Sequence, residues 1–236
     1  MSAPYRFTLA DDCLTCPLRR NSDFCNLPAK SLASFNEIGY LSVFPSHVEL
    51  LSEGQVPRGV YVLCSGRAKV SVVARDGKQV ILKVAGGRQP LGLSAVVSGR
   101  PSPVTVTTIE HCQVKFIDSR PFLDLVERDS AVALACAAAL SRDVLAAFAG
   151  VHGLLLARSS TEKLARLLLS WVVHEPHNLD LRVATDFTHE EMAQMIGSSR
   201  ETVTRLLGDM KRRELIRLEG ATLVIPNRIA LQAITA

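Results

Sequence analysis

The sequence predicts an α+β protein in which a β-rich first half is followed by a helical second half. Two observations predict this class. Residues 29–118 contain short β-branched runs separated by Gly, Pro and Asp turns, whereas apolar residues recur every three or four positions after Ser119. With 236 residues, of which 47% are hydrophobic and 21% charged, the chain has the length and composition of one or two folded domains.

Four parts are expected along the chain. Residues 1–28 form a loop-like segment that carries three of the six cysteines, and residues 29–128 form the β-rich domain. Residues 129–157 form a long helix, and residues 158–236 form a second domain.

The clearest strands of the β-rich domain are predicted at residues 59–64, 68–73, 79–84 and 104–109. The Asp76-Gly77 pair between two of them predicts a tight hairpin, because glycine tolerates the backbone conformation that such turns need. Many short strands at this spacing favour a sandwich or a barrel.

The long helix is expected to run from about Asp129 to Leu156 and to carry two apolar stripes. One stripe is Ala131, Leu134, Ala138, Ser141, Leu145, Phe148, His152 and Leu155, and the other is Ala137, Leu140, Val144, Ala147, Val151 and Leu154. A helix with two apolar faces needs two partners. We therefore expect it to contact its own domain on one side and a second subunit on the other, with an ordinary buried helix as the alternative.

Two short helices joined by a glycine are predicted from Thr188 onward. Thr188 and Glu191 form a capping box that begins the first helix, Gly197 ends it, and Ser198 and Glu201 form the capping box of the second. The buried faces are expected to contain Met192, Met195 and Ile196, then Val203, Leu206 and Leu207. This pattern is typical of a helix-turn-helix, whose second helix enters the major groove of DNA. Residues 220–225 predict a strand of a wing hairpin.

The second helix carries side chains that suit a DNA duplex. Arg200 and Arg205 can each donate two hydrogen bonds to guanine, and Glu201 can accept one from cytosine. The alternatives are a solvated basic helix face and a purely capping role for Glu201. The predicted DNA-contacting residues are Arg200, Glu201 and Arg205 for the bases, and Ser199, Thr202, Thr204, Lys211 and Arg212 for phosphates or methyl groups.

The segment Gly197-Ser-Ser-Arg-Glu-Thr-Val-Thr-Arg, the later Leu215-Ile-Arg-Leu-Glu-Gly and the β-rich first half together resemble the Crp/Fnr superfamily of transcription regulators. The resemblance covers nearly the whole chain. It implies an N-terminal double-stranded β-helix (a cupin-like jelly roll, similar to cyclic-nucleotide-binding domains) as sensor, a long dimerisation helix and a C-terminal winged helix-turn-helix. It also implies a homodimer whose partners are double-stranded DNA and RNA polymerase. In the family, an Arg-Glu-x-x-x-Arg pattern reads a GTGA-type half-site core, and Arg200, Glu201 and Arg205 match that pattern.

Family members that bind cyclic AMP carry a Gly-Glu-Leu stretch and, about ten residues later, an Arg-Ser pair. Here the Glu position is Gly92, the Arg-Ser positions are Ser102 and Pro103, and Arg100 is displaced. A bound anion without its arginine lacks its main stabilising interaction. This departure argues against cyclic AMP and leaves another small-molecule effector of the β-roll as an alternative.

The spacing Cys13-x2-Cys16-x8-Cys25, in a chain without a visible secretion signal, favours metal binding or redox chemistry over a structural disulfide. The segment is similar to the N-terminal region of oxygen-sensing Fnr-like regulators, which hold a [4Fe–4S] cluster with three N-terminal cysteines and a fourth from the end of the β-roll. The resemblance implies such a cluster here, bound by Cys13, Cys16 and Cys25, and a response to oxygen, nitric oxide or redox state. Cys112 is the candidate for the fourth ligand. Thiolates at this spacing also suit zinc.

The fourth ligand is less well defined than the first three. The family position falls near Lys115, and Cys112 lies three residues earlier, which places it on the opposite face of a regular strand. A structural role for Cys112, zinc binding, thiol redox chemistry and the absence of any sensory role therefore remain alternatives. Cys64 and Cys136 are interpreted as small core residues.

Other classes of protein are disfavoured. An enzyme built on a cupin-like roll would need clustered histidine and carboxylate ligands, whereas the six histidines are scattered and no predicted strand carries a His-x-His pair. The N-terminus lacks the apolar core of a signal peptide, and no uninterrupted apolar run approaches the roughly 20 residues of a membrane span. We expect a cytoplasmic, non-enzymatic protein without membrane contact; a regulator that binds DNA constitutively is a further alternative.

Overall fold

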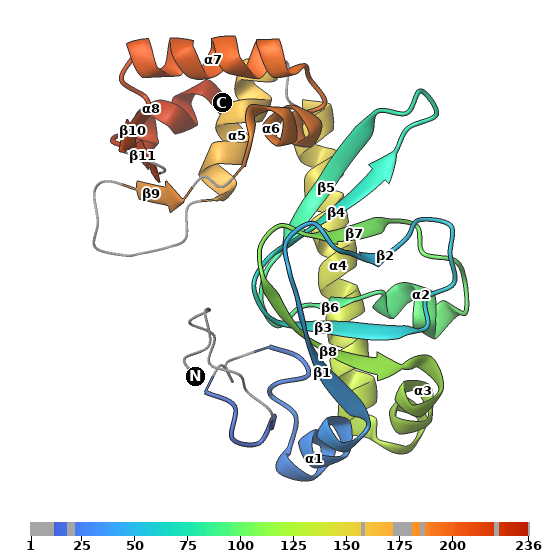
Figure 1. Cartoon of the computed structure of the whole chain (residues 1–236). Helices are drawn as coiled ribbons and strands as arrows, with labels where there is room; N and C mark the ends of the chain where they lie inside the picture. The colour runs from blue at the N-terminus through green and yellow to red at the C-terminus, as the bar shows by residue number, and fades with distance from the viewer. Residues whose placement is uncertain are drawn as a thin grey trace. The chain divides into compact units, whose positions relative to one another are not determined.

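The computed structural model describes residues 12–17, 22–156, 159–171, 181–184, 187–219 and 222–235 (Figure 1). The chain forms two compact units. The first comprises Met1–Val72 with Leu82–Leu145, and the second comprises Val73–Ile81 with Ala146–Ala236. The elements of each unit follow from the α+β pattern of the sequence, and the predicted fold class is confirmed.

Two four-stranded antiparallel sheets build the β-roll of the first unit. The first sheet has the order β1 (Gly39–Phe44), β8 (Cys112–Asp118), β3 (Gly59–Ser65) and β6 (Pro90–Leu91). The second has the order β2 (Glu49–Leu51), β7 (Thr105–Thr108), β4 (Ala68–Val73) and β5 (Gln79–Ala85). The four predicted strands correspond to β3, β4, β5 and β7, and Gly77 in the predicted hairpin has a φ of 81°.

The two faces of the first sheet enter two different cores. Leu63 and Val114 face the interior of the roll, where they pack with residues of the second sheet such as Val70 and Val106. Alternate residues of the same strands point to the other face. That face is covered by α1 (Ala29–Glu37), α3 (Ser119–Arg128) and α4 (Ser130–Leu156), while the short α2 (Leu93–Ser98) packs at its edge. The core residues on this side include Val60, Val62, Ile117, Phe24, Phe35, Phe122 and Val132.

The long helix α4 begins immediately after its N-cap. The Asp129 carboxylate accepts a hydrogen bond from the Ala131 N–H at 2.9 Å, and Ser31 of α1 donates a side-chain hydrogen bond to the same carboxylate. α4 contacts its own domain mainly through a face of residues that neither predicted stripe contains, while Ala131 and Leu140, one from each stripe, are partly buried against the same core. The buried residues of that face are Val132, Ala135, Cys136 and Ala139.

Both predicted stripes of α4 therefore lie largely on the surface of this single chain. Leu134 is 72% exposed, Leu145 63%, Phe148 68% and Val151 54%. The expectation that one of these stripes covers the helix's own domain was wrong, because small residues at 135, 136 and 139 allow α4 to approach the sheet more closely than the larger stripe residues would. Cys136 is buried in the core, as predicted.

Ser130–Val151 is also long and apolar enough to cross a membrane by length and composition, with a mean hydropathy of 1.7 over its best window. Charged residues at its middle argue for a different role, since such charges are costly in a bilayer. Arg142 pairs with Asp23, and Asp143 pairs with Lys83. These ion pairs and the buried Val132 face describe a helix that packs on its own domain.

The second unit contains a three-helix core and a small sheet. Its elements are α5 (Ser160–Ser170), β9 (Leu181–Ala184), α6 (His189–Ile196), α7 (Arg200–Arg212), β10 (Arg217–Glu219), β11 (Thr222–Ile225), α8 (Arg228–Gln232) and the 3-10 helix η1 (Ala233–Thr235). The strands pair antiparallel in the order β10-β11-β9. β11 coincides with the predicted wing strand, of which residues 220 and 221 lie outside the described part.

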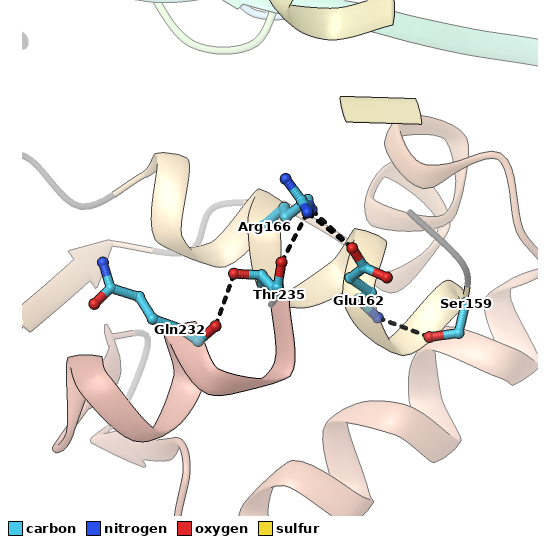
Figure 2. Close-up of polar contacts among 5 residues, drawn as sticks. All are labelled: Ser159, Glu162, Arg166, Gln232 and Thr235. Carbon is cyan, nitrogen blue, oxygen red and sulfur yellow. Dashed lines mark hydrogen bonds and ion pairs between the residues drawn. The ribbon is translucent and has the colours of Figure 1, made fainter. Parts of the chain in front are cut away.

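Polar contacts join α5 to the C-terminal 3-10 helix η1 (Figure 2). Ser159 caps α5 by accepting from the Glu162 N–H at 3.2 Å. Arg166 donates to Glu162 and to the carbonyl of Thr235, each at 2.8 Å. Because Glu162 has only 12% of its side-chain surface exposed, this pair fixes the C-terminal 3-10 helix against α5.

Candidate DNA-binding surface and N-terminal thiol cluster

The turn between α6 and α7 is built by local sequence chemistry. Thr188 caps α6 in a reciprocal capping box with Glu191, as predicted. Gly197 ends α6 with φ 62° and ψ 45°, a left-handed conformation that glycine adopts without steric cost. These two devices set where the first helix begins and where the chain turns into the second.

The cap of α7 lies one residue later than predicted. Ser199, rather than Ser198, is the N-cap, and its hydroxyl accepts from the Thr202 N–H at 3.3 Å. Glu201 bonds its own backbone N–H and the Ser199 side chain, and both hydrogen bonds lower the pKa of its carboxyl. The predicted box of Ser198 and Glu201 was wrong because Ser198 continues the turn after Gly197, its N–H bonding the Ala193 carbonyl.

α7 has one buried and one exposed face. The buried face contains the predicted Val203, Leu206 and Leu207 together with Met210. All eight predicted DNA-contacting residues lie on the remaining surface, and Thr202 alone among them is half-buried: Ser199, Arg200, Glu201, Thr202, Thr204, Arg205, Lys211 and Arg212. α6 packs beneath this helix through Met192, Ala193 and Ile196. The arrangement presents a polar, basic helix face on a rigid support.

One acidic residue on this face was not recognised from the sequence as part of the site. Asp209 pairs with Arg205 at 3.8 Å and also with Arg212. The spacings are four and three residues along one helix, which is the sequence signal that identifies such pairs. The carboxylate of Asp209 thus holds the two guanidinium groups near one another at the surface.

A second contact missed in the sequence involves His189 of α6. Its Nδ1 lies 2.8 Å from the Thr204 hydroxyl, which itself donates to the Arg200 carbonyl at 2.9 Å. Because the hydroxyl has a single proton, His189 is the donor to Thr204, with its proton on Nδ1. The two helices are thereby linked by a polar contact beside the predicted base-reading residues.

The cysteine-bearing segment is anchored to the first unit immediately before Cys25. Phe24 is 1% exposed and stacks on Phe35, with ring centroids 5.1 Å apart. Asp23, one residue earlier, forms the ion pair with Arg142 of α4. The position of Cys25 is therefore set by the hydrophobic core and is directly connected to the long helix.

The side-chain amide of Asn36 binds both the backbone of Cys13 and the side chain of Lys115. The Cys13 backbone N–H donates to Asn36 Oδ1 at 3.1 Å, and Lys115 Nζ donates to the same oxygen at 2.8 Å. Burial raises the pKa of the Cys13 thiol, the charge of Lys115 acts in the opposite direction, and Cys25 and Cys16 raise it further. Lys115 is only 3% exposed, so its ammonium group lies beneath this segment rather than in solvent.

Cys64 belongs to the same group of thiols, which the sequence did not indicate. Burial raises its pKa to about 12, and the neighbouring thiols of Cys13 and Cys25, then Cys16, add to that effect. The Lys115 backbone N–H bonds the Cys64 thiol and lowers its pKa. We call Cys13, Cys16, Cys25 and Cys64 the thiol cluster.

Cys112, the predicted fourth ligand, is not brought to this cluster. It is fully buried in the roll interior, where its Sγ lies 3.3 Å from the carbonyl oxygens of Arg67 and Glu110. Cys13 packs instead against the core on the other face of the sheet. Cys112 and Lys115 lie three positions apart in β8, and residues an odd number of positions apart in a strand point to opposite faces. The structure corrects the expectation that Cys112 joins Cys13, Cys16 and Cys25.

The donor chemistry of the thiol cluster fits a soft metal centre, since thiolates bind zinc and iron–sulfur clusters. Within the described ranges, no three Cys, His, Asp or Glu side chains stand close enough together to hold one metal ion as they are. None of the six cysteines, all of which lie in the described ranges, forms a disulfide. The thiol cluster would supply the ligands of such a centre, and binding it would require the four thiols to move closer together.

The segment that matches the cyclic-nucleotide motif is occupied by internal contacts. Ser102 is 3% exposed, and its hydroxyl donates to the Val104 carbonyl at 2.7 Å. The Arg100 N–H bonds the Ala95 carbonyl. An open pocket of about 390 Å³ lies elsewhere on the first sheet, and it is lined by Tyr40, Ser42, Phe44, Arg58, Tyr61, Phe116 and Asp118.

Two family models match the chain. Residues 41–129 match the cyclic nucleotide-binding domain, and residues 162–234 match the Crp-like helix-turn-helix domain. The first covers the β-roll from β1 to the end of α3, and the second covers α5 to the C-terminal 3-10 helix. Each unit of the structure thus has its own recognised counterpart.

Two transcriptional regulators are similar in sequence to most of the chain. The CRP-like cAMP-activated global transcriptional regulator of Mycobacterium tuberculosis is 27% identical over 193 residues, which cover 80% of this chain and 86% of that protein. The cAMP-activated global transcriptional regulator CRP of Escherichia coli O157:H7 is 24% identical over 192 residues, which cover 79% and 89%.

Solved structures agree on the fold. FixK2 from Bradyrhizobium japonicum superposes with a TM-score of 0.72 at 20% identity, covering 84% of this chain and 98% of that one. The c-di-GMP responsive global regulator CLP of Xanthomonas campestris gives a TM-score of 0.72 at 18% identity, with coverages of 84% and 99%.

Proposed function

Because the chain belongs to the Crp/Fnr family of DNA-binding transcription regulators, we propose that it acts as a homodimer on a palindromic site with GTGA-type half-site cores. We further propose that its input is oxygen, nitric oxide or redox state, received at the N-terminal cysteines through a [4Fe–4S] cluster. The observation that carries the first part is the exposed face of α7, with Arg200, Glu201 and Arg205 on a helix whose opposite face is buried.

Each of these three side chains has a base that suits it. The guanidinium groups of Arg200 and Arg205 donate two parallel hydrogen bonds to O6 and N7 of guanine, and the Glu201 carboxylate accepts from N4 of cytosine. Glu201 performs this role while it caps α7, because a carboxylate has lone pairs for both bonds. Two guanines on one strand, one of them paired with the cytosine that Glu201 contacts on the other strand, fit a GTGA-type core.

Contacts to the DNA backbone set the register of the helix in the groove. Lys211 and Arg212 at the end of α7 are exposed and provide positive charge for phosphates. Ser199 and Thr202 stand at the N-terminus of α7, where free backbone N–H groups also favour an anion. Thr204 commits its hydroxyl proton to the Arg200 carbonyl, so its methyl group is the part left for thymine.

The exposed stripe of α4 supports the proposed homodimer. Leu134, Leu145 and Phe148 follow one another at spacings that align every three or four residues on one helix face. Two copies related by a two-fold axis bury this face against each other and present two α7 helices to half-sites about 34–36 Å apart. The palindrome mirrors that symmetry.

RNA polymerase is the partner that such a bound dimer recruits or blocks.

The cysteine segment is linked to α4 by the chain's own residues. When bound, an iron–sulfur cluster supplies a centre sensitive to oxidants and gases. A change in the ligands Cys13, Cys16 and Cys25 alters the position of the segment that carries Asp23. Asp23 pairs with Arg142 on α4, next to the exposed stripe. The segment is thereby coupled to the helix that holds the dimer together.

Two measurements test the two parts separately. Fluorescence anisotropy with a palindromic GTGA duplex and a scrambled duplex should give affinities that differ by about 10³-fold or more. Equal affinity for both would refute the site. Protein purified without oxygen should contain about four irons and a matching amount of sulfide per chain, with visible absorption that bleaches in air. Iron-free protein that still selects the palindrome would refute the cluster alone.

A further inference from the structure

We infer that Cys64 of β3, and not Cys112 of β8, is the fourth thiolate ligand of the N-terminal metal centre, whose other ligands are Cys13, Cys16 and Cys25. The inference rests on the proposed function in one respect, namely that the N-terminal cysteines bind a soft metal ion or an iron–sulfur cluster. It assigns a ligand that neither the spacing of the cysteines nor the family pattern identifies.

The pairing of β3 with β8 places Cys64 on the correct face of the sheet. Val62 lies opposite Lys115 in the ladder, and Val62 packs into the core that α1, α3 and the cysteine segment cover. Cys64 is two residues further along the same strand. The register shifts between Leu63 and Ser65, so Cys64 is the extra residue of a β-bulge. Bulges re-aim a side chain and are common beside functional sites.

The neighbours of Cys64 connect it to the N-terminal cysteines. The Lys115 backbone bonds the Cys64 thiol, and the Lys115 side chain reaches Asn36, which also holds the Cys13 backbone. The thiols of Cys13 and Cys25 lie near enough to Cys64 to raise the pKa of its thiol further, beyond the larger effect of burial. Strands β3 and β8, helix α1 and the cysteine segment thus meet at a single place.

Lys115 provides a second observation that points to a negatively charged occupant. The residue is 3% exposed, and burying a charged side chain is costly unless an opposite charge faces it. Four thiolates around a divalent ion or an iron–sulfur cluster carry net negative charge, because each thiol loses its proton on binding. Lys115 then serves as the counter-ion of the centre. Gly39 leaves room for this side chain, since a Cβ there would lie 2.6 Å from Lys115 Cε.

Cys112 serves as the matched control, because it is a buried cysteine of the same sheet on the opposite face. We would compare the wild type, Cys64→Ser and Cys112→Ser after purification and reconstitution with iron and sulfide under anaerobic conditions. The expected result is that Cys64→Ser retains less than about a quarter of the wild-type iron and sulfide, while Cys112→Ser retains nearly all of it. Full cluster content in Cys64→Ser, or its loss in Cys112→Ser alone, would overturn the inference.

A rescue variant separates a ligand from a residue needed only for folding. Because Lys115 lies beside Cys64 on the same face, the double variant Cys64→Ser/Lys115→Cys returns a fourth thiol to the site from the neighbouring strand. It should recover at least about half of the wild-type iron content. A double variant that stays as iron-poor as Cys64→Ser, with wild-type thermal stability in both, would count against ligation by Cys64.

Cobalt distinguishes the failure of this inference from the failure of the proposed cluster. If the wild type assembles no iron–sulfur cluster, the same variants are titrated anaerobically with Co²⁺, whose thiolate charge-transfer absorption grows with the number of sulfur ligands. Cys64→Ser should then lose about a quarter of that absorption, and Cys112→Ser none. Identical spectra for all three proteins would overturn the assignment of Cys64. A wild type that binds neither iron nor cobalt would overturn both proposals.

Discussion

Asp209 pairs with two arginines on the basic surface of α7 and restricts where their side chains lie. It pairs with Arg205 four residues before it and with Arg212 three residues after it. Arg205 belongs to the predicted base-reading set, and Arg212 belongs to the predicted phosphate-contacting set. A free guanidinium samples many rotamers, and a partner that restricts it lowers the entropic cost of binding. Asp209 thus holds two long side chains ready for different parts of the duplex.

Replacing Arg200 with alanine should weaken operator binding by about 1–3 kcal/mol and relax selectivity at one base pair, because a bidentate contact to guanine is lost. Lys211→Ala is the matched control on the same helix. It should weaken binding to all sequences about equally and reduce the slope of log affinity against log salt by about 1. Anisotropy titrations over a salt series and a panel of single-base-pair variants measure both effects. A selective, tight-binding Arg200→Ala protein would contradict the base-reading role.

At single residues, the sequence predicted chemistry better than it predicted geometry. The residues of the recognition face could be named because the helical period separates them from Val203 and Leu206. Ser198 and Ser199 are adjacent and chemically identical, so only the conformation of Gly197 decides which of them caps α7. Cys64 resembled a core residue, because its relation to Cys13 depends on strand pairing that no local pattern encodes.

At the scale of elements, the N-cap of α4 connects two helices. Asp129 accepts from the Ala131 N–H and receives a hydrogen bond from Ser31 of α1. These bonds favour the charged carboxylate, and the side-chain bond from Ser31 is the largest cause of its lowered pKa. The start of the long helix is therefore sensitive to acid.

Asp129→Asn should make unfolding stability less dependent on pH in the acidic range. The pKa of Asp129 is lower in the folded chain than in the unfolded chain, so its stabilisation is fully present above the unfolded pKa and is lost as pH falls through the folded pKa. Asparagine keeps a capping oxygen but does not titrate. Urea unfolding of both proteins between about pH 3 and pH 7 measures the difference. Parallel stability curves for the two proteins would exclude this role.

Helix α4 also shows what the spacing of apolar residues can and cannot predict. The spacing of apolar residues identified a long helix, and the structure places it at Ser130–Leu156. It did not identify the face that packs on the domain, because three of the four buried residues there, Ala135, Cys136 and Ala139, are small and contribute little to a hydrophobic pattern beside Leu and Phe. Small residues allow close packing, and hydrophobic patterns give them little weight.

At the scale of the whole molecule, Phe148→Glu tests the proposed dimer. Phe148 is 68% exposed in the single chain, and each copy would lose about 1.5–3 kcal/mol of apolar burial at a two-fold interface. The variant should sediment as a monomer at concentrations where the wild type is dimeric. Ala146→Glu, at an exposed position outside both stripes, is the control and should remain dimeric. Dimeric Phe148→Glu protein would place the subunit interface elsewhere.

Arg142→Gln tests the link between the cysteine segment and α4. Losing the ion pair with Asp23 should reduce the difference in operator affinity between anaerobic and air-exposed protein by about threefold or more, because the segment no longer acts on the helix. Lys83→Gln is the matched control, since it removes the other ion pair of α4, with Asp143, without touching the segment. The measurement is anisotropy on one palindrome before and after exposure to air. An unchanged response in Arg142→Gln would show that the signal takes another route.

The register of β3 against β8 has a consequence for how related sensors are compared. Val62 and Lys115 are 53 positions apart in the chain but face each other across one ladder, and the bulge sets Cys64 beside them. In a paired sheet, the ligating cysteine can stand on either of two neighbouring strands in different proteins, while the metal site keeps its place in the fold. Regulators that lack a cysteine at the familiar position can therefore retain a complete set of ligands. An alignment column will classify such proteins as insensitive, whereas a comparison of sheet faces will group them with the sensors.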